Sequence, residues 1–206
     1  PNPKIEQDFG TDTMPQTADN LATEHQLTRE ECDQFAFNSQ QKYAAAKADG
    51  FFDGEIQSVM VPGGRKKPDV AVSDDEFPRP DTPLEKFAGL KALSPGGVTT
   101  AANASGLNDG AVALMMGSLE AGERAGAKPM ARILSSGVAG VAPRIMGYGP
   151  VPAAEIALKR AGLTIADMDV IEVNEAFAAQ VLACLKGLDV AFDDSRVNPN
   201  GGAITV

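Results

Sequence analysis

The sequence predicts an α/β protein, and three observations support this fold class. From Lys128 onward, apolar runs and helical patterns alternate in the order strand, helix, strand, helix, strand, which predicts a mostly parallel sheet. Val170, Ile171 and Val173 form a short β-branched run that leads into residues 176–185, so a buried strand is expected to run into a helix. The 206 residues are 43% hydrophobic, which suffices for one ordinary domain with a core or for parts of two.

Two helices are predicted near the N-terminus. Residues 14–25 place apolar side chains at helical spacing and carry Pro15 near their start, a position that helices favour for proline. Thr28-Arg29-Glu30-Glu31 fits a capping box, in which the threonine hydroxyl accepts an amide hydrogen and the glutamate reaches back to the cap. Apolar residues recur at helical spacing after this box, and Gly50 marks the expected end of the second helix.

Strands and a connector are predicted next. Residues 55–61 and 69–72 have the pattern of short strands, and the basic cluster at residues 65–67 between them is either a solvated hairpin tip or a surface that attracts an anionic ligand. An acidic connector follows, in which two prolines restrict the backbone around Arg79. Local chemistry leaves Arg79 either as a phosphate or ring contact or as an ordinary loop charge. A short helix is expected over residues 84–93.

The second half of the chain begins with small residues. Residues 98–110 pass from a β-like run into small and polar side chains, which either let a ligand approach the backbone or form a tight packing corner. A helix is expected over residues 111–126, a strand over 128–136, and a further helix that opens near Pro152 and closes at Gly162. The intervening glycine-rich loop is neither a dinucleotide fingerprint nor a P-loop, because it lacks their glycine spacing.

Composition excludes several classes of partner. The chain has 18 basic and 28 acidic residues and a formal net charge of -10, so it lacks the surplus of Lys and Arg that nucleic-acid binding requires. No run approaches the roughly 18 apolar residues that span a membrane. Cys32 and Cys184 lie far apart without metal-ligand spacing, which suits a reducing cytoplasm. Each is expected to be a small buried hydrophobe rather than a nucleophile or a metal ligand.

Asn174 and Glu175 stand where the predicted strand of residues 170–173 meets its helix. In α/β proteins the carboxyl ends of strands face the ligand crevice, so an amide at this junction is placed to hold a substrate or a water. The alternative is an asparagine that only caps the helix. Local chemistry alone favours the cap.

Four segments, considered together, carry a family resemblance. They are Thr13-Met14-Pro15-Gln16-Thr17-Ala18, Asn103-Ala104-Ser105-Gly106-Leu107-Asn108-Asp109-Gly110, residues 137–150, and Asn174-Glu175-Ala176-Phe177-Ala178 with Asn200-Gly201-Gly202-Ala203. In order and spacing they resemble the degradative thiolases. Within that family, the forms Met-Pro-Gln-Thr-Ala, Pro-Arg-Pro-Asp-Thr, Ala-Pro-Arg-Ile-Met-Gly and Val-Asn-Pro-Asn-Gly-Gly look most like the 3-oxoadipyl-CoA thiolases of aromatic degradation.

The resemblance implies a thiolase fold that is incomplete in this chain, with an α/β loop domain and part of a βαβαβ core. Residues 1–107 would form most of the loop domain that covers coenzyme A, residues 108–127 would return to the N-terminal core domain, and residues 128–206 would begin the C-terminal thiolase domain. Thiolases are homo-oligomers, so the parent protein is expected to be a homodimer or a homotetramer.

The resemblance also implies a substrate site. Three positions fall where the family contacts coenzyme A: Arg79, Ala101 and Ser105. Three more fall at the acyl and pantetheine end: Met146, Ala176 and Phe177. Asn174 matches the residue that holds a catalytic water of an oxyanion hole. Acyl-CoA and CoA are therefore the expected ligands, with coenzyme A as a substrate and no permanently bound cofactor.

The family reaction is the thiolysis of a 3-oxoacyl-CoA, or the reverse Claisen condensation, through an acyl-cysteine. It needs a nucleophilic cysteine, a histidine that activates it and a second cysteine as acid and base. Cys32 and Cys184 match neither cysteine motif of the family. The chain starts at Pro1 without a Met and stops in an apolar run, so it is expected to be an internal fragment of a longer protein. The two catalytic cysteines and the histidine are therefore expected outside this fragment. The competing interpretations are a non-catalytic thiolase-like module that binds acyl-CoA or lipid, and a ketoacyl synthase, which shares the fold but lacks Asn-Glu-Ala-Phe.

Overall fold

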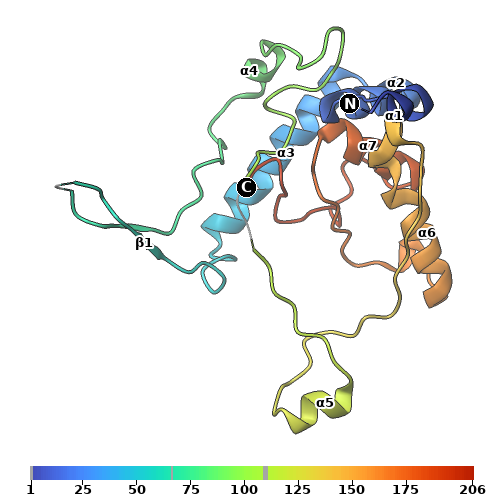
Figure 1. Ribbon diagram of the computed structural model, residues 1–206. Coiled ribbons are helices and arrows are strands. Elements are labelled where there is room, and N and C mark those ends of the chain that lie inside the picture. Colours follow the sequence, from blue (N-terminus) through green and yellow to red (C-terminus); the bar gives the residue numbers. More distant parts are fainter. Residues whose placement is uncertain (1, 66, 109–110) are drawn as a thin grey trace.

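The computed structural model describes residues 2–65, 67–108 and 111–206. Lys66, in the predicted basic cluster, and Asp109-Gly110, which complete one of the four motifs, lie outside this part of the chain. Helix α7 (Ala178–Gly187) packs against α2 (Met14–His25) and α3 (Arg29–Ala48), and these helices form the main body together with the segments that follow α7 (Figure 1).

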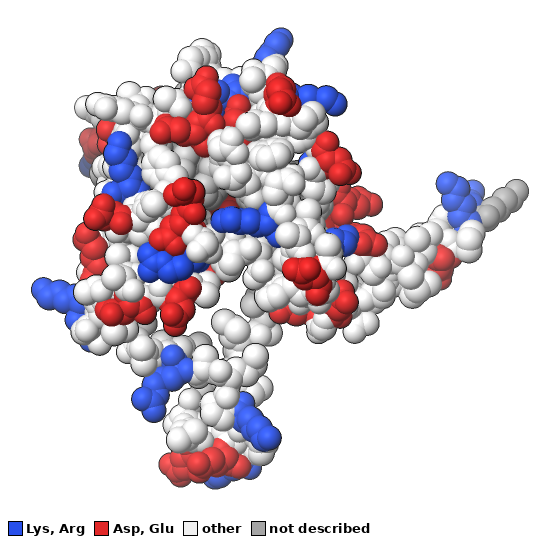
Figure 2. All heavy atoms as spheres, turned by 180° about the vertical axis from the view of Figure 1, so that it is seen from behind, with Lys and Arg blue, Asp and Glu red and all other residues white. Residues whose placement is uncertain are grey.

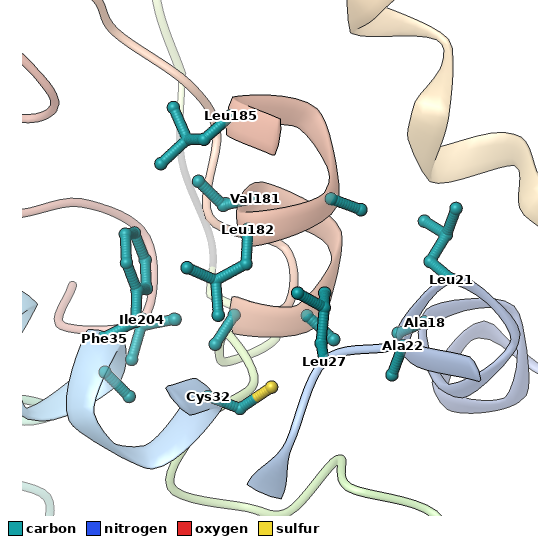
Figure 3. Packing of buried hydrophobic residues seen from close by; sticks show 14 of the residues in the cluster. Ala18, Leu21, Ala22, Leu27, Cys32, Phe35, Val181, Leu182, Leu185 and Ile204 are labelled. Carbon is teal, nitrogen blue, oxygen red and sulfur yellow. The ribbon is translucent and has the colours of Figure 1, made fainter. Parts of the chain in front are cut away.

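The core is built around α7 because this helix is apolar on nearly every side. Residues 178–185 are all buried, and a helix that is apolar all round is stable in water only when other elements cover it. Figure 3 shows the Leu182 side chain pointing from α7 toward Cys32 and Phe35 of α3. Leu21 of α2 is also fully buried in this cluster. The core therefore fixes the position of the chain at the N-terminus of α7.

The predicted N-terminal helices are confirmed, and local chemistry explains their ends. At α3, the Thr28 hydroxyl accepts the Glu31 amide at 3.1 Å, and the Glu31 carboxylate accepts the Thr28 amide at 2.7 Å, which completes the capping box. The helix ends at Ala48, and Gly50 follows with φ of 74°, a left-handed conformation that glycine adopts without strain. A short helix, α1 (Pro3–Phe9), precedes α2.

The two predicted strands form a hairpin that projects from the main body (Figure 1). Strands β1 (Val59–Val61) and β2 (Val70–Val72) pair antiparallel, with Met60 opposite Ala71. All six residues of the two strands are exposed, so the hairpin packs neither face against the rest of the chain. The helix predicted over residues 84–93 is shorter than expected, and α4 ends at Ala88 (Leu84–Ala88).

The predicted parallel sheet is largely absent from the described chain. Its one parallel pairing is an isolated bridge between Ile171 and Val197. Residues 128–136 were expected to form a strand but are assigned no strand, and Ile133 is 70% exposed. A strand needs a neighbour for its backbone N–H and C=O groups, and among the described residues none pairs with this segment. The apolar pattern predicted a strand here, but no described residue pairs with this segment.

The helix predicted over residues 111–126 is also mostly wrong. Only α5 (Leu119–Arg124) forms there, at the end of a long excursion from the main body (Figure 1). Val112, Leu114 and Met115 are each more than 80% exposed. Short helices in water depend on packing an apolar face, and this segment has no surface against which to pack.

The remaining helices are close to the prediction. The 3₁₀ segment η1 (Pro143–Tyr148) leads into α6 (Pro150–Ala161), which has prolines in its first turn and ends at Gly162 with φ of 70°. A second 3₁₀ turn, η2 (Ile165–Asp167), follows. Within residues 2–65, 67–108 and 111–206, no helix has the length and apolar character needed to cross a membrane.

Candidate functional site

A pocket of about 280 Å³ lies between α2, η1 and the start of α7. It is lined by Met14, Thr17, Ala18, Leu21, Met146, Gly147, Pro150, Asn174, Ala176, Phe177 and Gln180. These residues are uncharged and mostly apolar, and the amides of Asn174 and Gln180 are the strongest polar groups among them. A concave apolar pocket with a few polar groups is the usual form of a small-molecule site.

The pocket brings together four of the residues predicted as site residues. Met146 comes from η1, whereas Asn174, Ala176 and Phe177 come from the segment that leads into α7. These elements meet because α7 is buried between α2 and the rest of the body, with η1 packed against both helices. These four residues therefore line one pocket, whereas their contact with an acyl or pantetheine group stays a prediction.

Asn174 does not cap α7, so that interpretation is wrong. The helix N-cap is Phe177, which makes no side-chain cap hydrogen bond, and Asn174 stands three residues earlier, outside the helix. Within the described chain the Asn174 amide has no hydrogen-bond partner, and the residue is exposed at the pocket. Its amide is therefore free to bind a water or a substrate oxygen.

The backbone before Asn174 is held by the side chain of Asn198. The Asn198 amide oxygen accepts Val173 N at 2.8 Å, and its Nδ2 donates to Val173 O at 2.9 Å. Asn198 has φ of 41°, a left-handed conformation that asparagine tolerates better than most residues. This pair of hydrogen bonds replaces the strand ladder that would otherwise hold Val173.

Residues 98–105 run beside the N-terminus of α7. Ser105 N donates to Ala176 O at 3.0 Å, and Ala178 N donates to Asn103 O at 2.9 Å. The predicted Ser105 therefore lies next to the predicted Ala176, and Ala101 is exposed in the turn just before. These backbone contacts fit the tight packing corner, which was one of the two alternatives, and the approach of a ligand to this loop stays a prediction.

Two carboxylates anchor this loop to the helices below it. Asp19 of α2 accepts the amides of Val98 and Thr99 at 3.0 Å and the Thr99 hydroxyl at 2.8 Å. The buried Asp33 of α3 accepts the amide of Asn103 at 2.8 Å. Because each carboxylate comes from a helix of the core, the loop is placed by the core rather than by its own sequence.

Arg79 does not line the pocket. Its guanidinium Nη1 donates to the backbone oxygens of Phe77 at 2.9 Å and Pro78 at 2.8 Å, and its backbone N donates to Gln40 at 2.8 Å. The side chain is exposed in the connector after the hairpin. The structure thus separates Arg79 from the four pocket residues, and its contact with coenzyme A stays a prediction.

The cysteines are buried, as predicted. Cys32 and Cys184 are both 0% exposed. Burial, with help from the nearby Asp33, raises the pKa of the Cys32 thiol to about 12. Burial raises the pKa of the Cys184 thiol to about 11. A nucleophilic cysteine needs a lowered pKa and access to its substrate, and neither thiol has them.

The other candidate base is His25, at the end of α2. Its ring stacks on Tyr148 with centroids 4.9 Å apart. His25 is not among the residues that line the pocket. The described residues include no cluster of His, Cys, Asp and Glu that could hold a metal ion.

The residues that line the pocket include no charged side chain. Figure 2 shows acidic and basic side chains interspersed over one face of the body, with basic side chains gathered toward the end of the projecting hairpin. Arg144, two positions before Met146, pairs with Glu24 at 2.7 Å and is not among the residues that line the pocket. The polar chemistry of the pocket therefore depends on neutral amides.

Comparison with known families matches both halves of the chain. Residues 3–120 match the family model described as "Thiolase, N-terminal domain", and residues 127–206 match "Thiolase, C-terminal domain". The chain belongs to the thiolase family. The beta-ketoadipyl-CoA thiolase of Acinetobacter baylyi is 52% identical over all 206 residues, which is 100% of this chain and 51% of that thiolase. The chain thus spans about half the length of the relatives it matches.

Solved thiolase structures have the same fold. The acetyl-CoA acetyltransferase of Bacillus anthracis superposes with a TM-score of 0.87 at 44% identity, over 94% of this chain and 48% of that one. Human mitochondrial 3-ketoacyl-CoA thiolase in complex with CoA superposes with a TM-score of 0.84 at 46% identity, over 93% of this chain and 47% of that one. These similarities confirm the thiolase fold predicted from the sequence.

Sequence reasoning missed the α2 and α7 walls of this thiolase pocket. Leu21 and Gln180 both line it. The sequence pattern around Leu21 predicts only a buried helix face and gives no sign of a ligand site. The Gln180 side-chain oxygen is buried and has no partner among the described residues. An amide inside the otherwise apolar run of residues 178–185 was the available signal, because buried polar groups are rare without a role.

Proposed function

We propose that the protein carrying this chain is a thiolase, an acyl-CoA C-acyltransferase. It cleaves a 3-oxoacyl-CoA with CoA, or runs the reverse Claisen condensation, through an acyl-cysteine. The observation that carries this proposal is the uncharged pocket in which Asn174 stands beside Met146, Ala176 and Phe177 in a chain of the thiolase family. Coenzyme A is a substrate in this proposal, and no cofactor is bound permanently.

The proposed role of Asn174 follows from its free amide. In thiolysis the cysteine thiolate adds to the 3-oxo carbon, and the carbon–carbon bond between C2 and C3 then breaks. Its electron pair passes to the leaving acetyl-CoA as an enolate, so negative charge develops on the thioester oxygen until C2 takes up a proton. An amide that holds a water at this oxygen stabilises the charge more in the transition state than in the ground state, and this difference is what raises turnover. The apolar wall around Asn174 strengthens the effect, because charges interact more strongly where water is excluded.

The nucleophilic cysteine, the activating histidine and the second cysteine are proposed to come from other parts of the same protein. Cys32 and Cys184 have raised pKa values and no access to the pocket. His25 is stacked on Tyr148 outside it. This chain contributes the acyl wall, one oxyanion-hole residue and, through Arg79, Ala101 and Ser105, contacts to coenzyme A.

The proposed substrate is 3-oxoadipyl-CoA, which thiolysis converts to succinyl-CoA and acetyl-CoA. Support comes from the 52% identity to the beta-ketoadipyl-CoA thiolase of Acinetobacter baylyi. A homodimer or homotetramer and a cytoplasmic location belong to the same proposal.

The test is thiolysis by the full-length protein, with 3-oxoadipyl-CoA and acetoacetyl-CoA compared at equal concentrations and products separated by chromatography. The proposal expects CoA-dependent release of acetyl-CoA, with a higher kcat/KM for 3-oxoadipyl-CoA. A preference for acetoacetyl-CoA would contradict the substrate but keep the reaction. Tight binding of either acyl-CoA without any cleavage would contradict the reaction and favour a binding module.

A further inference from the structure

Glu175 follows the pocket residue Asn174 and faces the opposite way. Asn174 is exposed at the pocket, whereas Glu175 is 1% exposed in the interior. A buried carboxylate is costly unless its oxygens accept hydrogen bonds, so the contacts of Glu175 need an explanation.

Both carboxylate oxygens are used by donors from distant parts of the chain. Oε1 accepts Asn198 Nδ2 at 2.8 Å. Oε2 accepts the Ser39 hydroxyl at 2.7 Å and Ile204 N at 3.3 Å. No ion pair within the described residues involves Glu175, so neutral groups alone satisfy it. The carboxylate thus joins α3, the Asn198 loop and the final segment to the backbone of Asn174.

The donors cannot reorient, because other contacts hold them. Asn198 uses its amide oxygen and Nδ2 to bind both backbone groups of Val173, so its amide cannot flip. Ser39 Oγ also accepts Gly202 N at 3.2 Å and lies 3.0 Å from the Thr205 hydroxyl.

Two glycines allow this close packing. A Cβ on Gly202 would lie 2.5 Å from the Glu175 carboxyl carbon, and one on Gly201 would lie 2.9 Å from Ser39 O. Gly201 also has φ of 84°, which favours glycine. The loop can approach the carboxylate because both positions lack side chains.

We propose that Glu175 is a positioning residue that holds the Asn174 amide at the pocket. This inference rests on the proposed thiolase function. The buried carboxylate fixes the peptide between Val173 and Asn174 against α3 and residues 198–205, so that the amide of Asn174 keeps one orientation toward the thioester oxygen. Glu175 itself touches no substrate.

A glutamine at this position cannot restore the contacts. If its NH₂ replaced Oε1, two NH₂ groups would face each other, since Asn198 cannot flip. If its NH₂ replaced Oε2, it would face the amide of Ile204, which is also a donor. Glu175→Gln therefore leaves a mismatched donor in the interior at unchanged size, whereas Glu172→Gln makes the same change on an exposed residue of the same segment.

The experiment compares Glu175→Gln with Glu172→Gln in the full-length protein, by kcat, KM and hydrogen exchange of the peptide that contains Asn174. For Glu175→Gln the proposal expects kcat to fall by up to about 100-fold, the cost of misplacing a group near the reacting atoms. KM should stay close to wild type, and the peptide should exchange faster. Glu172→Gln should match wild type. A wild-type kcat for Glu175→Gln, or a rise in KM alone, would overturn the proposal.

Two further variants distinguish positioning from general damage. Ser39→Ala removes one donor from α3 without adding a mismatched group, so it should lower kcat less than Glu175→Gln does. This variant keeps the test usable if Glu175→Gln folds poorly. In an Asn174→Ala background, Glu175→Gln should cause no further loss of kcat, because it acts through the amide that is already missing. Additive losses would overturn the proposal.

The outcome also separates this inference from the proposed function. A wild-type full-length protein that cleaves no 3-oxoacyl-CoA contradicts the function. Hydrogen exchange of the Asn174 peptide then decides the inference alone. Unchanged exchange in Glu175→Gln would overturn it, and faster exchange in that variant but not in Glu172→Gln would support it.

Discussion

At the residue scale, Asn174→Ala should separate the proposed catalytic role from stability in the full-length protein. Removing one oxyanion-hole donor costs about 10²- to 10³-fold in turnover, and this is the upper range for a donor that acts through water. The melting temperature should not change, because Phe177 rather than Asn174 is the N-cap of α7. Turnover, KM and melting temperature should be recorded together.

A matched control is Asn38→Ala, which removes an asparagine amide from α3 outside the pocket. It should leave kcat at the wild-type value. If Asn174→Ala lowered the melting temperature while turnover stayed within a few-fold of wild type, the catalytic role of this amide would be wrong.

Arg79→Ala should act on binding. Coenzyme A is anionic and carries an adenine face, and an arginine offers it both a charge and a plane, which alanine lacks. We expect the KM for CoA to rise about tenfold, because a hydrogen bond to a charged group contributes roughly 1.5 kcal/mol, with kcat unchanged. Arg124→Ala, on the exposed helix α5, is the control. A collapsed kcat at constant KM would show that Arg79 has another role.

The buried cysteines predict slow alkylation and a pH-dependent stability. Their raised pKa values keep the thiols protonated in the folded state, whereas unfolded thiols ionise above a pKa of about 8.5. The folded state therefore binds more protons above that pH, and the free energy of unfolding should fall as pH rises from 8 toward 11. Urea titrations at several pH values measure this slope. The double variant Cys32→Ala, Cys184→Ala should have a smaller slope, and an equal slope would contradict the prediction.

At the element scale, α7 determines stability. Leu182 is 1% exposed, and removing its side chain should lower the free energy of unfolding by about 2–5 kcal/mol, through lost burial and the cavity left behind. Leu93→Ala is the control, because Leu93 is 51% exposed and the cost should be about 0.5 kcal/mol or less. Denaturant unfolding measures both variants. Equal losses would mean that α7 is not the centre of the core.

The elements that were predicted well are those whose signals are local. The Thr28 capping box and the Gly50 and Gly162 ends depend on residues a few positions apart, and all three are found. The strand expected over residues 128–136 depends on a partner far away in the sequence, and so does the helix expected over 111–126. The periodicity of apolar residues identifies a face that is stable only when buried, but it does not identify the element that covers this face.

At the scale of the whole molecule, the candidate site was predictable in part. Motif resemblance identified Met146, Asn174, Ala176 and Phe177, which the structure brings into one pocket. It did not identify the contacts of Glu175 with Ser39, because that pair is separated by 136 positions and both residues look like ordinary helix or loop polar groups. Long-range hydrogen bonds between short polar side chains leave no local pattern, so only the folded arrangement reveals them.

The last prediction concerns the 206-residue chain on its own. Apolar side chains at Val112, Met115, Met130 and Val138 are each at least 88% exposed, and the hairpin adds a second exposed apolar surface. Contiguous apolar surface and unpaired strand edges favour association, so the isolated chain should self-associate and show no thiolysis above a boiled control. Light scattering after size-exclusion chromatography measures the first property.

The triple variant Val112→Ser, Met115→Ser, Met130→Ser should shift the isolated chain toward the monomer, because it removes apolar area without touching the core. A matched change of exposed polar residues, Glu6→Ser, Lys91→Ser, Glu123→Ser, should not. A monomeric, cooperatively folding wild-type chain would show that the excursion around α5 finds cover within these residues. Thiolysis by that chain would be the stronger contradiction, since it would require a nucleophile that the buried cysteines do not supply.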